Sequence, residues 1–157
     1  MNVQNNGKKI TDPTFPANVE LSNDNRSNFA LKGEHKRSWT ANNPDKHIGT
    51  CLKIDGALIA TTEQNKCDGG LLLDDNRLYL VEFKGNNYET AVTQLVETKK
   101  YFERNYADYN LIFYARIVGR SFPKATTELQ NAKRELNKKK NFGQNYRLFE
   151  CKGVEKI

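Results

Sequence analysis

Apolar positions along the chain follow a helical period in two stretches. Between residues 88 and 105 they recur every three or four positions, and residues 126–140 show the same spacing. The first stripe consists of Ala91, Val92, Leu95, Val96, Thr98 and Phe102, and the second of Leu129, Ala132 and Leu136. Asn87 precedes the first stripe and is expected to cap that helix. We therefore predict two helices, each with one apolar face, and expect the first to pack against a sheet.

The signals for strands are short apolar runs between polar turns. They cover residues 51–62, a run that begins near Lys66, the run around residues 78–81, and residues 111–118 and 146–151. The helix at 88–105 stands between two of these strands, which favours a parallel pair. The run Leu78-Tyr79-Leu80-Val81 is apolar on both faces, as is typical of a central strand that is covered on both sides.

The N-terminal part of the chain has a weaker pattern. Residues 1–28 are polar, rich in asparagine and interrupted by Pro13 and Pro16, so we expect a flexible arm. Residues 29–43 are predicted to form a short helix that carries several basic side chains and Trp39. Either these side chains hold a phosphate backbone while Trp39 stacks on a base, or Trp39 anchors an exposed helix to the core. Residues 29–157 are expected to form a single α/β domain.

The turn between two apolar runs determines which charged residues meet. Asp74-Asp75-Asn76 has the composition of a hairpin turn. With all three residues in the loop, Asp68 pairs with Glu82, and Lys84 lies on the same face because it is two residues further on. A loop of two residues would instead turn Asp68 to the opposite face. The grouping of Asp68, Glu82 and Lys84 therefore requires an odd loop length or a bulge.

Two neighbouring carboxylates and a lysine can form a metal site for hydrolysis. Carboxylates repel each other unless one is protonated or a cation lies between them. Their hard oxygen ligands favour Mg²⁺ or Mn²⁺, which can activate a water molecule and neutralise a phosphate. An acid-x-Lys triplet in a strand is more commonly a solvated ion pair. Here the triplet Glu82-Phe83-Lys84 ends a strand that is apolar on both faces, and this position favours a functional role.

Asp68, the triplet Glu82-Phe83-Lys84 and the following helix with Gln94 resemble the PD-(D/E)xK nuclease superfamily, over about residues 51–120. This superfamily includes restriction endonucleases and Holliday-junction resolvases. The resemblance implies a restriction-endonuclease-like, three-layer core in which helices flank a central mixed sheet, so that residues 29–157 would be a nuclease-like domain. Cys67 departs from the pattern, because the superfamily name has proline at that position.

The resemblance also implies roles for individual residues. Asp68 and Glu82 would be metal ligands, Lys84 the catalytic lysine, and Gln94 a catalytic-site glutamine rather than an ordinary surface residue. A further acid is expected before these residues. Glu34 is preferred over Glu20 for this position, and Asp55 is a weaker alternative. The cofactor would be Mg²⁺ or Mn²⁺.

The charge of the chain changes the choice of partner. A net charge of +6 and a pI near 9.2 favour an acidic partner, of which nucleic acid is the commonest, and DNA is our choice. The residues expected to hold phosphates are Lys133, Arg134, Lys138, Lys139, Arg120 and Lys124. A lysine-rich helix end is also explained by its favourable interaction with the helix dipole.

These observations predict a metal-dependent endonuclease that hydrolyses phosphodiester bonds in DNA. The alternative is a catalytically inactive nuclease-like module that binds nucleic acid or a protein, and a third reading is an ordinary interaction domain with a chance triplet. Because small nucleases that cut both strands often work as dimers, a homodimer is a further expectation.

The remaining features concern the cellular compartment. No segment approaches the length of a transmembrane helix, and the N-terminus lacks the apolar run of a signal peptide, so no membrane association is expected. Cys51, Cys67 and Cys151 are odd in number and widely spaced, which suggests reduced thiols in a cytoplasmic protein. No Cys/His spacing resembles a zinc site.

Overall fold

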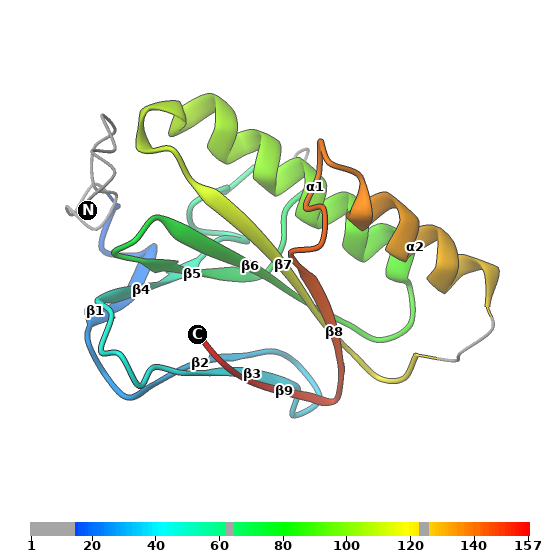
Figure 1. Cartoon of the computed structure of the whole chain (residues 1–157), viewed down its shortest axis with the longest axis horizontal. Helices are drawn as coiled ribbons and strands as arrows, with labels where there is room; N and C mark the ends of the chain where they lie inside the picture. Colours follow the sequence, from blue (N-terminus) through cyan, green and yellow to red (C-terminus); the bar gives the residue numbers. More distant parts are fainter. Residues whose placement is uncertain (1–14, 62–64, 123–125) are drawn as a thin grey trace.

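Two β-sheets and two helices are stacked in three layers in the computed structural model, which describes residues 15–61, 65–122 and 126–157 (Figure 1). The central sheet has six strands, in the spatial order β1 (Glu20–Asp24), β4 (Gly49–Lys53), β5 (Gly69–Leu73), β6 (Arg77–Lys84), β7 (Ile112–Gly119) and β8 (Tyr146–Glu150). The smaller sheet has three, in the order β2 (Asn28–Lys32), β3 (Ser38–Asn42) and β9 (Lys152–Lys156). The helices are α1 (Tyr88–Asn105) and α2 (Thr127–Asn137), with a short 3₁₀ turn at Ala107–Tyr109.

Strand β6 is buried on both faces, as its apolar run predicts. Leu78 and Leu80 belong to the core beneath the helices, whereas Tyr79 and Val81 belong to the core between the two sheets. This alternation follows from the two-residue period of a strand. It also places Glu82 and Lys84 on the helix side of the central sheet.

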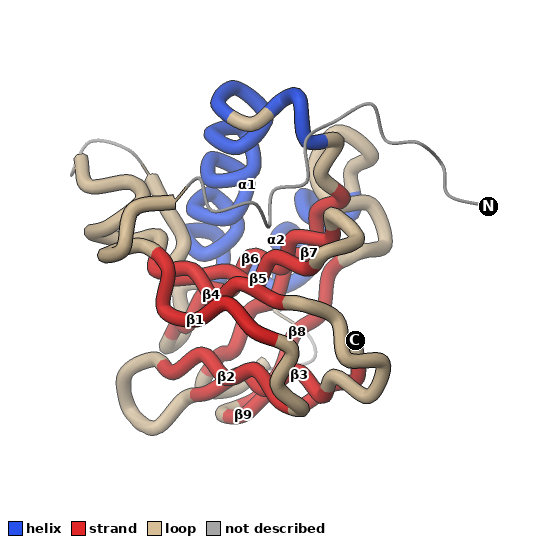
Figure 2. The backbone as a smooth tube through the Cα atoms, turned by 90° about the vertical axis from the view of Figure 1, so that its left-hand side faces the viewer, coloured by secondary structure: helices blue, strands red, loops and turns tan. Residues whose placement is uncertain are grey.

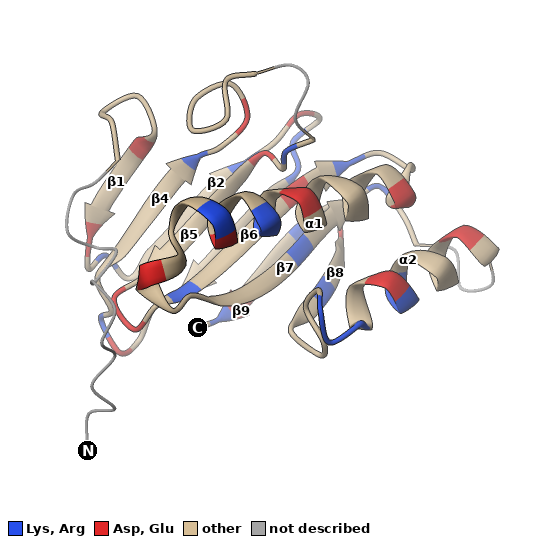
Figure 3. Cartoon of the chain, turned by 90° about the horizontal axis from the view of Figure 1, so that it is seen from above, with Lys and Arg blue, Asp and Glu red and all other residues tan. Residues whose placement is uncertain are grey.

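Both helices lie on the same face of the central sheet, as the view from above shows (Figure 3). The opposite face is covered by the three-stranded sheet (Figure 2). A mixed α/β fold was expected and is confirmed, but the expectation that helices flank the sheet is wrong for the described residues. Helix α1 begins and ends as predicted, and Asn87 caps it by accepting a hydrogen bond from the Thr90 N–H. Strands β6 and β7 are parallel, also as predicted.

The predicted helix at residues 29–43 is wrong, because this segment is the β2–β3 hairpin. Phe29 and Leu31 on β2, and Trp39 and Ala41 on β3, are buried at alternate positions. That two-residue period is the signature of a strand with one buried face. His35 and Lys36 have positive φ angles of 55° and 60° in the tight turn that connects the strands.

The predicted N-terminal arm also extends too far. Residues 1–14 lie outside the described residues. From Phe15 onward the chain contributes to the fold, because Phe15 and Val19 are buried and β1 pairs antiparallel with β4. Strand β9 lies beyond the last strand that the sequence predicts, and it pairs parallel with β3.

A buried ion pair connects the two sheets. The guanidinium of Arg116 on β7 donates hydrogen bonds of 2.6 and 2.9 Å to the carboxylate of Glu155 on β9. The indole Nε1–H of Trp39 donates to the same carboxylate at 2.8 Å. Trp39 is therefore a core residue, as its second interpretation expected, but it lies on a strand and not on a helix. Every member of this network is buried, so its polar atoms satisfy one another away from solvent.

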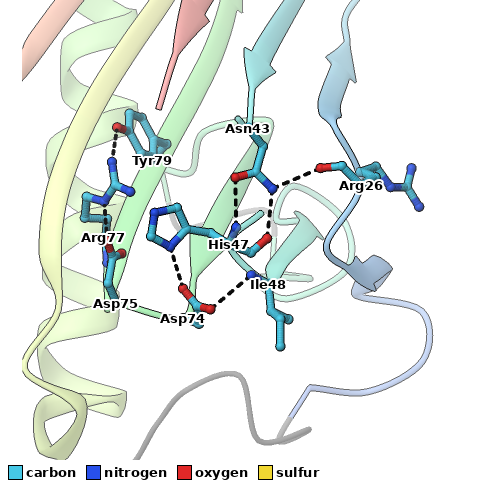
Figure 4. A network of polar contacts seen from close by, with 8 residues as sticks. All are labelled: Arg26, Asn43, His47, Ile48, Asp74, Asp75, Arg77 and Tyr79. Carbon is cyan, nitrogen blue, oxygen red and sulfur yellow. Dashed lines mark hydrogen bonds and ion pairs between the residues drawn. The ribbon is translucent and has the colours of Figure 1, made fainter. Parts of the chain in front are cut away.

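The β5–β6 turn has the odd length that the candidate site requires. Asn76 adopts a left-handed conformation with φ of 70°, and its N–H donates to the carbonyl of Leu73 at 3.0 Å. Asp74 accepts hydrogen bonds from His47 Nδ1 at 2.9 Å and from the Ile48 N–H at 3.1 Å, which ties the turn to the start of β4 (Figure 4). The loop therefore comprises Asp74, Asp75 and Asn76, and the strand pairing follows from it.

Candidate active site

The pairing of β5 with β6 brings two acidic side chains together at the end opposite the turn. Leu72 pairs with Leu78 and Gly69 with Val81, so the next residue, Asp68, faces Glu82. The backbone N–H of Asp68 donates to Glu82 Oε1 at 3.1 Å, and the backbone N–H of Phe83 donates to Asp68 Oδ2 at 2.9 Å. The predicted register is therefore confirmed, and each carboxylate is fixed by the backbone of the other strand.

Lys84 and Gln94 complete this group. Lys84 Nζ lies 3.6 Å from Glu82 Oε2 and donates a 3.1 Å hydrogen bond to Gln94 Oε1. Gln94 stands on the second turn of α1, the helix that follows β6 and packs back over it. The structure thus brings Asp68, Glu82, Lys84 and Gln94 into one continuous set of polar contacts.

Both carboxylic acids of the pair have a raised pKa, and the shift is large for Glu82. Burial, reinforced by the negative charge of Asp68, raises the pKa of Glu82 to about 9. Burial also raises the pKa of Asp68, although hydrogen bonds from the Phe83 N–H and from Glu82 oppose this shift. At neutral pH, Glu82 therefore keeps its proton and shares it with the Asp68 carboxylate. Perturbed acids of this kind are concentrated at functional sites.

These residues line a cleft of about 860 Å³ at the end of the central sheet. One wall is the β2–β3 turn, which contributes Gly33, Glu34, His35 and Arg37. The other walls come from the ends of β4, β5 and β6 and from α1. In Figure 3, acidic and basic segments gather beyond the arrowhead of β4, in agreement with this mixed lining.

The predicted further acid has a clear position but no direct contact with the pair. Glu34 lines the same cleft from the β2–β3 turn, and its side chain is exposed. Asp55 also lines the cleft, and its charge contributes to raising the pKa of Asp68. Glu20 lies on β1, where it pairs with Leu52. Within the described parts of the chain, no group of three or more His, Cys, Asp and Glu side chains is arranged to hold a metal ion.

The basic residues predicted to hold nucleic acid are only partly near the cleft. Lys133, Arg134, Lys138 and Lys139 are exposed on or just after α2, and none of the described residues that line the cleft comes from α2. Arg120 does not line the cleft, but its backbone N–H donates to the carbonyl of Gly85, which does. Lys124 lies outside the described residues.

The cleft instead takes its positive charge from residues that the predicted nucleic-acid set omits. These are Lys32, Arg37 and Lys53, with His35 beside them. The sequence does show a cluster of basic residues after Gly33. The helix predicted for residues 29–43 gave no reason to place that cluster near the acidic pair. A hairpin interpretation would have placed that cluster in a turn.

In comparisons with known proteins, no family model, no curated protein and no solved structure matches this chain. The candidate site therefore rests on its own geometry. None of the helices in the described ranges is both long and apolar enough to cross a membrane.

The donor atoms suit a hard divalent cation. Two carboxylates at the end of a sheet provide oxygen ligands, and Mg²⁺ in proteins is commonly held by one or two carboxylates together with water and substrate phosphates. One oxygen of each carboxylate accepts a hydrogen bond from a backbone N–H, and the second oxygen of Glu82 lies 3.6 Å from Lys84 Nζ, so a bound cation would take the place of the proton that the two acids share. Burial and the charge of Asp68 together raise the pKa of Glu82, and a cation between the two acids would offset both effects.

Proposed function

We propose that this protein is a metal-dependent nuclease that hydrolyses phosphodiester bonds in DNA. The observation that carries the proposal is the convergence of Asp68, Glu82, Lys84 and Gln94 on one cleft. The group combines residues from two strands and a helix, whereas the acid-x-Lys triplet involves a single strand. It also supports the resemblance to the PD-(D/E)xK nucleases on which the proposal draws.

In this proposal Asp68 and Glu82 hold Mg²⁺ or Mn²⁺ at the end of β5 and β6. The ion would lower the pKa of a bound water molecule and neutralise charge on the phosphate. Lys84 orients the attacking water and stabilises negative charge through its ammonium group. Gln94 holds that ammonium in place through the 3.1 Å hydrogen bond. Lys32, Arg37 and Lys53 contact phosphates at the walls of the cleft.

A second function is favoured by one observation. Although four acids line the cleft, no three His, Cys, Asp or Glu side chains of the described residues are arranged to hold a metal ion. A module that retains the cleft, binds nucleic acid through its basic wall and no longer cuts would fit that limited ligand set. Such a module would keep an affinity for DNA that falls with salt, without any cleavage.

Cleavage assays distinguish the two functions. Linear, supercoiled, single-stranded and branched DNA, and RNA, are incubated with Mg²⁺ or Mn²⁺ and the wild type, Lys84→Ala or Lys100→Ala. Lys100 is an exposed lysine on α1, so its replacement removes the same charge away from the acidic pair. The nuclease proposal predicts metal-dependent cutting of DNA that Lys84→Ala abolishes and Lys100→Ala retains. Folded wild-type protein that binds DNA but cuts none of these substrates would favour the inactive module.

A further inference from the structure

The outer face of the three-stranded sheet is a second charged surface of this protein. Side chains on β2, β3 and β9 alternate between the core and solvent. Its outward residues, here called the outer sheet face, are Asn28, Ala30, Lys32, Ser38, Thr40, Asn42, Lys152, Val154 and Lys156. This face points away from the helices, on the far side of the molecule from α1 and α2 (Figure 1).

Strand pairing arranges these residues in three rows across the sheet. Lys32 pairs with Ser38 and Ser38 with Lys152, Ala30 and Val154 flank Thr40, and Asn28 and Lys156 flank Asn42. Lysines therefore occupy both outer rows and both edge strands. The residues between them are uncharged.

The charge on this face has one sign. It carries three lysines and no aspartate or glutamate. Among the described residues, none of these lysines takes part in an ion pair. The nearest acid in the strand, Glu155, points inward to Arg116 and Trp39. A surface of unpaired cations attracts a polyanion.

The outer sheet face is continuous with the candidate active site. Ala30 and Lys32 on β2 belong to this face and also line the cleft. A ligand that leaves the cleft along β2 therefore meets Thr40 in the next strand and Val154 and Lys152 beyond it.

We propose that the outer sheet face binds the phosphate backbone of a nucleic-acid duplex whose adjoining part lies in the cleft. The inference takes the class of ligand, nucleic acid, from the proposed function. It adds that the ligand is a duplex and that the duplex runs from the cleft across the outer sheet face. Single-stranded binding surfaces stack bases on aromatic side chains, and this face has none. Protein interfaces centre on aromatic or arginine anchors, whereas the large apolar residue exposed here is Val154. Phosphate contacts need only the cations and polar groups that are present.

The test measures how binding depends on salt. Fluorescence anisotropy of a labelled DNA duplex, with chelator present so that no cutting occurs, gives the slope of log affinity against log salt concentration. The double variant Lys152→Gln/Lys156→Gln is compared with Lys133→Gln/Lys139→Gln, which removes the same charge from exposed positions on and after α2. Each lost phosphate contact lowers the magnitude of the slope by about 0.9. We expect a decrease of about 1.8 for the first variant and no change for the second, with unaltered thermal unfolding in both.

Other outcomes would overturn the inference. An unchanged slope in Lys152→Gln/Lys156→Gln, or an equal decrease in both variants, would remove the outer sheet face from the path. Tighter binding of the matching single strand would contradict a duplex ligand, and displacement of the duplex by polyglutamate of equal charge would assign the face to an acidic protein. Because the measurement needs no catalysis, a failure of the nuclease proposal appears separately, as absent cutting of DNA with metal.

Discussion

Replacement of Glu82 by glutamine should make the metal-free protein more stable at neutral pH. Glu82 is 2 % exposed, and the pKa of its carboxyl group is raised from 4.5 to about 9 by burial and by the charge of Asp68. In the unfolded chain the same group ionises at its ordinary pKa. As pH rises above 4.5, the unfolded state therefore loses a proton that the folded state keeps, and the wild type loses stability until the pH reaches about 9.

The magnitude follows from the size of the shift. Each pH unit within that window costs the wild type about 1.4 kcal/mol, so a rise from about pH 5 to about pH 7 costs about 2.7 kcal/mol. Glu82→Gln has no proton to lose and escapes this cost, while its amide can still donate a hydrogen bond to Asp68. The free energy of unfolding of the variant, relative to the wild type, should therefore increase by about 2.7 kcal/mol over this range.

Urea unfolding at several pH values, in the presence of chelator, measures this difference. Glu103→Gln is the matched control, because the Glu103 side chain on α1 is 50 % exposed and the same chemical change is then made outside the acidic pair. A difference between Glu82→Gln and the wild type that stays constant from about pH 5 to about pH 7 would refute the assigned protonation of the acidic pair.

Three further variants test other parts of the structure. Asn76→Val and Asn76→Gly both remove the hydrogen bond that the buried Asn76 amide donates to the Tyr109 carbonyl, but only valine places a β-branched side chain at φ of 70°, so Asn76→Val should be less stable than Asn76→Gly by about 1–3 kcal/mol in urea titrations; equal stabilities of the two variants would contradict the turn geometry. Arg116→Met leaves the buried carboxylate of Glu155 without its cation and should cost about 3–5 kcal/mol in the same assay, and a loss below about 1 kcal/mol would show that the pair is not buried as described. Gln94→Ala releases the Lys84 ammonium and should lower the rate of DNA cleavage about tenfold with little change in KM, while an unchanged rate would exclude a positioning role.

Local signals were sufficient to predict α1 and the β5–β6 hairpin. The apolar stripe of α1 is long, and Asn87 marks its start. The sequence predicted a hairpin turn at residues 74–76 but left its length open, and the observed three-residue loop gives the register that places Asp68 opposite Glu82. This part of the candidate site lies within one short stretch of the chain, so pairing rules could predict it.

The rest of the site depends on contacts between distant segments. The β2–β3 hairpin forms one wall of the cleft. Its buried residues Phe29, Leu31, Trp39 and Ala41 alternate with more exposed ones, but the basic turn divides this pattern into two short pieces that were not recognised as strands in the sequence. A three-stranded sheet, rather than helices, covers the second face of the central sheet.

Strand β9 gave no signal because its inward residues include Gly153 and Glu155. The latter is buried only because Arg116 and Trp39, more than 35 residues away in sequence, complete its hydrogen bonds. A buried glutamate cannot be distinguished from a surface glutamate by sequence pattern when its partners lie so far away.

A calorimetric titration with Mn²⁺ at about pH 7 tests most directly whether Asp68 and Glu82 form a divalent-cation site. Repeating it in buffers with different enthalpies of ionisation also counts the protons released on binding. We predict that the wild type binds Mn²⁺ and releases about one proton, that of Glu82, and that Asp68→Asn removes binding. Absence of binding by the wild type, binding without proton release, or binding retained by Asp68→Asn would contradict this account of the site.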